Sequence, residues 1–244
     1  MMSRRIESWG TATLLVVALG LGTPAWGAAP VTMTARQCPA DQALANGYIA
    51  RYDVAGAKAR ISQLTLTHIN GWSGYDAGGA TIRLWHGLPG DDAELYRVFD
   101  EAERSILYTS SGLALLDQSR PWHRVAELAD TNALTPVGGE RDDCGRQRHY
   151  TGGNDTQMID VWAYADSGLV TALTVRPTKS EAATPLMTYR LAAVEGGSED
   201  ALARVARWRG YQSTDFADIG DNESDPFLQR MIHQGFIEHA GHRH

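Results

Sequence analysis

The stretch Thr81–Tyr108, TIRLWHGLPGDDAELYRVFDEAERSILY, decides the fold of this chain. Three short runs in it are rich in Leu, Ile, Val and aromatic residues: Thr81–His86, Glu94–Phe99 and Ser105–Tyr108. Turn-forming residues separate these runs, first around Pro89 and Gly90 and then in the polar Asp100–Glu103. Because strand side chains alternate between two faces, short alternating runs punctuated by turns predict an antiparallel meander.

The same pattern recurs later in the chain. Met158–Tyr164 and Leu169–Val175 flank an Asp-Ser-Gly sequence that favours a tight hairpin. Further strands are predicted at Tyr48–Val54, Arg60–Ile69 and Leu186–Val194. Two segments are predicted to be loops, the glycine-rich Asn70–Ala80 and the polar Glu140–Gly153. We therefore expect a sheet of about seven to nine strands.

Three helices are predicted after the first meander. Pro121–Leu134 carries apolar residues at helical spacing, namely Trp122, Val125, Leu128 and Ala129. A second helix begins after Ser198 and carries the apolar stripe Leu202, Val205 and Trp208. A third begins at Asp225-Pro226 and ends near Gln234. Because so short a helix is not stable alone, its apolar residues are predicted to be buried against the second helix or the sheet: Phe227, Leu228, Met231 and Ile232.

These elements predict an α+β fold. We expect a curved, half-barrel-like antiparallel β-sheet built from meanders, with packed helices and a helical C-terminal segment. The predicted division of the chain is a signal peptide at 1–27, a sheet domain with one crossing helix at 28–197, a C-terminal helical segment packed on the same domain at 198–237, and a His-rich tail at 238–244.

The N-terminal residues have the features of a secretory signal peptide. Two arginines precede the apolar run Thr11–Gly22, and Ala25-Trp26-Gly27 supplies the small residues that a signal peptidase reads. The apolar run is too short to span a bilayer, and no other apolar run approaches that length. We expect cleavage after Gly27, with Ala29 as the alternative. The predicted product is a periplasmic or secreted protein with no transmembrane segment after signal removal.

The charge balance disfavours one class of partner. The chain of 244 residues has a formal net charge of −7, and the predicted signal peptide contributes +1 of it, so the mature chain would carry −8. Affinity for nucleic acid rests on Lys and Arg neutralising phosphates. An acidic chain is therefore not expected to bind nucleic acid.

The chain has two cysteines, Cys38 and Cys144. Both lie in the predicted mature chain, where an oxidising compartment favours a disulfide bond between them. The bond would close a loop of about 105 residues and would stabilise the fold by roughly 4 to 5 kcal/mol at most. The alternative is a thiolate that ligates a metal, although the paired close spacing of a zinc site is absent from the sequence.

Two resemblances follow from these patterns. The run Gly210–Phe236, GYQSTDFADIGDNESDPFLQRMIHQGF, is similar to the ending of a family of exported proteobacterial proteins of unassigned function. That likeness covers the C-terminal quarter and parts of the meanders. Export, two antiparallel meanders and a crossing helix also resemble the architecture of the LolA-like lipoprotein carriers. This second resemblance implies a concave sheet with an apolar face, and fold alone does not fix function.

Histidines and acids near the C-terminus are candidate metal ligands. The tail carries His239, His242 and His244, with His233 further upstream, and neutral imidazoles suit divalent copper, nickel or zinc. The alternative is a disordered end with no metal site. The acidic stretch Asp215–Asp225 is the densest group of oxygen ligands, but its spacing is not that of an EF-hand. We predict that these acids cap helices and face water, with Asp225 as a helix cap.

No catalytic motif is present in the sequence. There is no Gly-x-Ser-x-Gly, no His-Glu-x-x-His and no phosphate-binding loop. His86, His123 and His149 each lie beside an aromatic residue and are candidate general bases, although such histidines more often have no catalytic role. A catalytic triad assembled from distant residues stays open.

Three functions are compatible with the sequence. The first is a non-enzymatic periplasmic binding or accessory protein that holds a small apolar ligand or a protein partner in the concave sheet. The second is a copper- or zinc-handling accessory protein that uses the C-terminal histidines. The third is an enzyme of unknown class. An apolar pocket would favour the first, convergent His and carboxylates the second, and a buried His–carboxylate pair in a cleft the third.

Overall fold

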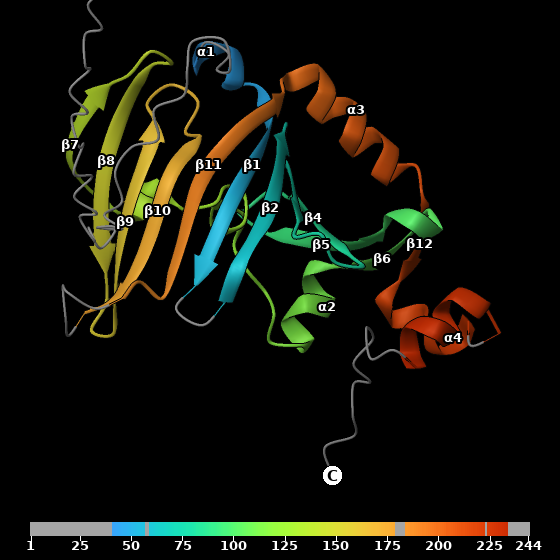
Figure 1. Cartoon of the computed structure of the whole chain (residues 1–244). Coiled ribbons are helices and arrows are strands. Elements are labelled where there is room, and N and C mark those ends of the chain that lie inside the picture. Colours follow the sequence, from blue (N-terminus) through green and yellow to red (C-terminus); the bar gives the residue numbers. More distant parts are fainter. Residues whose placement is uncertain (1–40, 57–58, 179–183, 223, 234–244) are drawn as a thin grey trace, which may run out of the picture.

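The computed structural model describes residues 41–56, 59–178, 184–222 and 224–233. Twelve strands in these residues form one curved sheet (Figure 1). The strands are β1 Gly47–Gly56, β2 Ala59–Ile69, β3 Trp72–Asp76, β4 Ile82–Gly87, β5 Ala93–Phe99, β6 Arg104–Tyr108, β7 Thr135–Arg141, β8 Arg146–Gly153, β9 Gln157–Tyr164, β10 Val170–Pro177, β11 Met187–Gly196 and β12 Gln212–Asp215. The predicted α+β fold with a curved antiparallel sheet is confirmed.

Helices occupy few of the described residues. The α-helices are α1 Asp41–Leu44, α2 Ser110–Leu115, α3 Ser198–Arg209 and α4 Pro226–His233. The short 3₁₀ turns are η1 Asp100–Ala102, η2 Trp122–Arg124, η3 Thr131–Ala133, η4 Phe216–Asp218 and η5 Gly220–Asn222. Within the described part of the chain, no helix combines the length and apolar composition needed to cross a membrane.

The sheet consists of two meanders joined at its centre. Its strand order is β12-β6-β5-β4-β3-β2-β1-β11-β10-β9-β8-β7, so β12 and β7 are the two edges. Neighbouring strands are antiparallel, except that β12 runs parallel to β6. The first meander, β1–β6, and the second, β7–β11, meet where β1 pairs with β11. The described residues therefore form twelve strands, more than the seven to nine that were expected.

The strands that were not predicted have weak sequence signals. β3 lies in the predicted glycine-rich loop, and its Gly74 is required because an added Cβ would lie 2.6 Å from the Trp208 ring. All of β8 and the last two residues of β7 lie in the predicted polar loop Glu140–Gly153. Every residue of β7 is exposed, so the strand shows no apolar alternation that a sequence pattern could reveal.

The predicted helix at Pro121–Leu134 is wrong. This segment, called the strap from here on, contains only the 3₁₀ turns η2 and η3. The four apolar residues at helical spacing, Trp122, Val125, Leu128 and Ala129, are nevertheless all partly buried against core clusters. An irregular chain achieves this packing because sheet side chains, rather than helical neighbours, bond several of its carbonyl groups.

Helix α3 covers one face of the sheet. Its Ala201, Val205 and Trp208 are 0%, 1% and 3% exposed and pack on apolar strand residues that include Ile49, Ile69, Trp72, Ile82, Leu84 and Val98. The predicted stripe is correct for Val205 and Trp208 and wrong for Leu202, which is 53% exposed. A buried stripe that includes Ala201 allows the helix to lie close to the strands.

The C-terminal segment packs on the opposite face, near β5 and β6. Phe227, Leu228 and Met231 are 5%, 1% and 8% exposed, and Ile232 is partly buried in the same cluster. The rings of Phe99 and Phe227 meet edge to face at 5.0 Å. The predicted burial is confirmed for Phe227, Leu228 and Met231. Helix α4 uses the sheet as its partner rather than α3, which lies on the other face (Figure 1).

Candidate functional site

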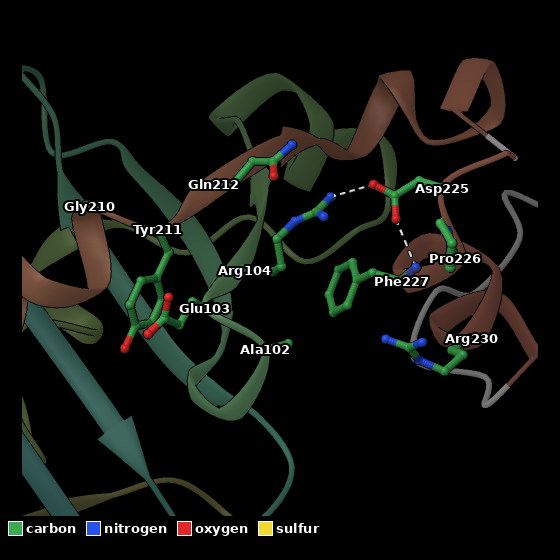
Figure 2. Close-up of a pocket in the computed structure, with 10 residues that line it drawn as sticks. All are labelled: Ala102, Glu103, Arg104, Gly210, Tyr211, Gln212, Asp225, Pro226, Phe227 and Arg230. Carbon is green, nitrogen blue, oxygen red and sulfur yellow. Dashed lines mark hydrogen bonds and ion pairs between the residues drawn. The ribbon is translucent and has the colours of Figure 1, made fainter.

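A cleft of about 610 Å³ lies at the β12 edge of the sheet (Figure 2). Three chain segments form it: the start of β6, the start of β12 and the start of α4. Its lining residues are Ala102, Glu103, Arg104, Gly210, Tyr211, Gln212, Asp225, Pro226, Phe227 and Arg230. We call it the edge cleft. Its wall carries two arginines and two acids, so it is not the apolar pocket that a lipid-like ligand would need.

An ion pair fixes the wall of the edge cleft. Asp225 accepts a 2.7 Å hydrogen bond from Arg104 Nη2 and also caps α4 by accepting from the backbone N–H groups of Phe227 and Leu228. The hydrogen bond from Arg104 is the largest cause that lowers the pKa of the Asp225 carboxyl group, and the cap bonds add to it. The predicted role of Asp225 as a helix cap is therefore confirmed.

The arginines of the edge cleft are not saturated by the chain's own acceptors. The Arg104 guanidinium lies 4.8 Å from the centre of the Phe227 ring, and its Nε is buried without a hydrogen-bond partner among the described residues. Arg230 lies three residues after Phe227 and extends toward the same space (Figure 2). It has no ion-pair partner within the described ranges. Within that part of the chain, one paired and one unpaired guanidinium group therefore lie beside one aromatic ring.

Asp100 holds the rim of the edge cleft in place. Its carboxylate accepts hydrogen bonds from Trp208 Nε1 at 3.2 Å, Tyr211 OH at 2.6 Å and Arg207 Nη2 at 3.0 Å. These bonds tie η1 to the end of α3 and to the residue that precedes β12. Burial first, and then the bond to Asp100, raises the pKa of the Tyr211 hydroxyl. The residues around Tyr211 are therefore positioned before any ligand arrives.

The strap covers the face of the sheet opposite α3. Tyr75 OH lies 2.9 Å from the carbonyl oxygen of Val125 and 2.8 Å from that of Glu127, so one hydroxyl donor serves two acceptors. His68 Nδ1 donates to the carbonyl oxygen of Ala126 at 2.9 Å, and Ser73 Oγ donates to the same oxygen. Three consecutive main-chain carbonyls are therefore held by side chains of β2 and β3.

Further contacts fasten the two ends of the strap. At its start, the Trp122 ring lies where an added Cβ on Gly87 would approach within 2.6 Å. The neighbouring His123 binds Asp91 through Nδ1 at 2.5 Å and approaches Asp130 through Nε2 at 3.7 Å. At its end, Leu134 lies over Gly152, where an added Cβ would come within 2.5 Å of the Leu134 side chain. Small residues on the sheet therefore make room for the strap.

Glu127 is the most perturbed carboxyl group of the strap. Burial, with a smaller contribution from Asp130, raises its pKa to about 7. Burial raises the pKa values of three tyrosines of the sheet, Tyr48, Tyr52 and Tyr75, and the charge of Glu127 raises them further. On the same face, burial lowers the pKa of His68. A carboxyl group with this pKa changes its charge near neutral pH.

The candidate general bases form pairs with carboxylates, but none of them lines the edge cleft. His86 lies 2.9 Å from Glu94, His149 lies 2.9 Å from Asp160, and His123 binds Asp91 in the strap. His86 and His149 also stack on Trp72 and Trp162, at ring separations of 3.9 and 4.4 Å. Each pair joins neighbouring strands or fastens the strap, which is a structural role. The edge cleft itself was not predicted, because its residues come from three distant segments.

The predicted metal ligands are not tested by the structure. His239, His242 and His244 lie outside the described residues, and only the backbone of His233, at the end of α4, is described. Among the described residues, no group of three or more His, Cys, Asp or Glu side chains could hold a metal ion. In the acidic stretch, Asp215 accepts from the backbone N–H of Ala217 and caps η4. Metal binding by the tail stays a prediction.

The predicted disulfide also stays a prediction, because Cys38 lies outside the described residues. Cys144 is 8% exposed and belongs to the same buried cluster as Leu44 of α1. Leu44 follows Cys38 by six residues, and six residues of fully extended chain reach about 20 Å. The position of Cys144 is therefore within reach of Cys38.

No protein-family model matches the sequence. No similar curated protein is found either. Several solved structures share part of the fold. PNGF-II has a TM-score of 0.42 and 9% identity, with 72% of this chain and 33% of that chain covered. The Pseudomonas aeruginosa MucA/MucB complex has a TM-score of 0.35 and 15% identity, with 66% and 58% covered.

An outer membrane lipoprotein-sorting protein domain from Vibrio parahaemolyticus has a TM-score of 0.29 and 8% identity, with 66% of this chain and 92% of that domain covered. The chain thus spans about a third of PNGF-II and just over half of the MucA/MucB chain it matches. Likenesses this distant carry no argument about activity, ligand or location. They agree only with the architecture expected from the sequence, a curved open sheet.

Proposed function

We propose that this protein is an exported periplasmic binding or accessory protein, without catalytic activity, that holds an extended acidic segment of a protein partner in the edge cleft. The observation that carries the proposal is the pair Arg104 and Arg230 beside the free edge strand of an open sheet. The sequence-based proposal placed a ligand in the concave sheet. The strap covers the face opposite α3, so the edge cleft is the better candidate.

The edge strand favours an extended polypeptide as the ligand. β12 is the last strand in the sheet order, so only one of its edges is paired with another described strand. Extended peptides add to such edges through main-chain hydrogen bonds, while neighbouring pockets select the side chains. The edge cleft begins at Gly210–Gln212, where β12 starts. A segment that pairs with β12 would therefore place a side chain in the cleft.

The charges of the edge cleft favour an acidic side chain or carboxylate. Arg104 already has one carboxylate partner, Asp225, whereas Arg230 has none among the described residues. An arginine guanidinium binds a carboxylate through two parallel hydrogen bonds, which gives both energy and orientation. A carboxylate from the partner would bind between the two guanidinium groups, next to the Phe227 ring.

Site-specific photo-crosslinking tests the proposal in the bacterial envelope. A crosslinking residue replaces Gln212, which is exposed in the edge cleft, and a second variant carries it at the exposed Gln63 of β2. We expect a discrete protein adduct at position 212 and none at position 63. Mass spectrometry of the adduct should map the crosslink to an acidic, extended segment of the partner.

A charge reversal in the cleft supplies the matched control. Arg230→Glu should lower the yield of the adduct at position 212 more than tenfold, because it replaces attraction of the acidic segment with repulsion. Arg141→Glu makes the same change in net charge on the exposed edge strand β7 and should leave the adduct intact. An adduct that survives Arg230→Glu, or a small anion retained in native mass spectrometry in place of a protein, would refute the proposal.

A further inference from the structure

The strap-covered face of the sheet has the properties of an occupied binding groove. No strap residue lines the edge cleft, and the inference does not depend on the proposed function. None of the strap residues Pro121–Leu134 is fully buried, although the sheet residues on the same face include Tyr48, Tyr52 and Leu66, which are 0% to 1% exposed. The strap is therefore a half-exposed cover over a fully buried floor.

The floor binds the strap mainly through its main chain. Tyr75, His68 and Ser73 together satisfy three consecutive carbonyl groups of the strap. Main-chain carbonyls are common to every polypeptide, so these donors hold a chain segment without reading its sequence. If the strap left, all three side chains would be free to bond another chain segment.

Side-chain seats along the strap add a coarse apolar pattern. Trp122 and Val125 pack against the cluster beneath β4–β6, and Leu128 and Leu134 pack against the cluster formed by β9 and β10. Gly87 and Gly152 leave the space that Trp122 and Leu134 occupy. A ligand for this floor therefore needs apolar side chains at intervals of a few residues, as the strap has them.

Side-chain contacts, rather than strand pairing, hold the strap on the sheet. It belongs to no ladder of the sheet, and its turns η2 and η3 are single 3₁₀ turns. The Asp91–His123 pair that fastens its start is exposed, with side chains 45% and 44% accessible, and exposed pairs of this kind contribute little. Burial of Glu127, which raises its pKa, opposes docking of the strap at neutral pH.

We propose that the strap is a displaceable occupant of a polypeptide-binding groove, and that an apolar segment of another protein, in the same irregular conformation, takes its place on Tyr75, His68 and Ser73. The strap competes with that segment as a covalently attached ligand. Attachment gives it an effective concentration in the millimolar range, so a free peptide binds weakly while the strap is fastened. Loosening the strap should therefore raise the affinity of the groove for a peptide.

The probe is a fluorescent synthetic peptide with the sequence of residues 121–134, tested by anisotropy on the full chain. The loosened variant is Trp122→Ala/His123→Ala, which removes the fastenings at the start of the strap and leaves the floor intact. The matched control is Asn132→Ala, an exposed strap residue. We expect the loosened variant to bind the peptide at least tenfold more tightly than the wild type and the control do. A scrambled peptide should bind none of the three proteins.

Limited trypsin digestion reports the strap's position independently, because the exposed Arg124 lies within it. Cleavage after Arg124 should be faster in the loosened variant than in the control. If the strap is cleaved faster but the peptide does not bind, the groove is refuted. If cleavage is unchanged, the strap is not displaceable and the proposal fails.

A second route covers the case in which the double variant does not fold. Gly87→Ala places a Cβ against the Trp122 ring and unseats the start of the strap from the sheet side, and Gly79→Ala, in open space, is its control. The probe is then a peptide of residues 124–134, which lacks the excluded tryptophan. The same tenfold gain is expected for Gly87→Ala over Gly79→Ala, and equal binding by the two variants overturns the inference.

Discussion

At the scale of single residues, the carboxyl groups of this protein differ in how many hydrogen-bond donors surround them. Asp225 and Asp100 each collect several donors, so their charges are stabilised where they lie. Glu127 is partly buried near Tyr48, Tyr52, Tyr75 and Asp130. Desolvation raises its pKa, and no cation is among the causes that shift it. The same functional group therefore stabilises the fold at two positions and opposes it at the third.

Stability should depend on pH through Glu127. Its pKa of about 7 lies above the ordinary value of 4.5, so the folded state holds the proton more tightly than the unfolded state. The free energy of unfolding should therefore fall as pH rises from about 4.5 to about 7, by at most about 3 kcal/mol, and stay level above that. Glu127→Gln should remove this fall, as measured by urea unfolding at pH 5 and pH 8. An equal pH dependence in both proteins would show that other groups cause it.

Asp225 and Asp221 should respond very differently to alanine. Asp225→Ala removes the cap of α4 and the partner of Arg104, and should lower the free energy of unfolding by about 1 to 2 kcal/mol. Asp221→Ala changes an exposed residue of η5 and should stay within about 0.5 kcal/mol of the wild type. Thermal melts of the two variants check this. Similar losses from both would mean that the acidic stretch acts as a unit.

At the scale of elements, the sequence predicts which residues turn inward better than it predicts the elements that carry them. The apolar residues at helical spacing between Trp122 and Ala129 are the ones that pack on the core. The strap is nevertheless irregular, because side-chain donors on β2 and β3 replace the hydrogen bonds of a helix. Edge strand β7 is invisible to pattern, since it is exposed throughout. The edge cleft could not be predicted either, because it unites residues more than 100 positions apart, such as Arg104 and Asp225.

The contact between β3 and α3 can be tested at one glycine. Gly74→Ala would bring a Cβ to 2.6 Å from Cζ3 of Trp208, whose Nε1 is held by Asp100. The helix must then move away from the sheet, at a cost of about 1 to 3 kcal/mol in the free energy of unfolding. Gly79→Ala, in open space, should change it by less than about 0.5 kcal/mol. Denaturant midpoints that coincide for the two variants would contradict the close approach.

At the scale of the whole molecule, an open sheet with two edges needs additional fastening. The turn between β7 and β8 is organised by Asp142, which accepts from the N–H groups of Cys144 and Gly145 and from Tyr164 OH. This network holds Cys144 next to the core cluster that contains Leu44. A bond from Cys144 to the N-terminal segment would therefore join the second meander to the chain that leads into β1.

Thiol labelling tests that bond. Unreduced mature protein should show no reactive thiol, and reduction should expose two. Reduction should also lower the melting temperature and decrease the free energy of unfolding by up to roughly 4 to 5 kcal/mol. A Cys38→Ser/Cys144→Ser variant should melt like the reduced protein. Two reactive thiols in the unreduced protein would disprove the pairing and restore Cys144 as a candidate ligand or nucleophile.

The junction of β1 with β11 has a consequence for the order in which the chain folds. The first meander pairs strands that follow each other closely in sequence, whereas β1 must wait for β11, more than 130 residues later. While the exported chain folds, the edge of β1, with its unpaired main-chain groups, is therefore exposed until β11 pairs with it. The slowest step should be the closure of this long-range pair, and the partly folded chain that precedes it is the species most prone to aggregate.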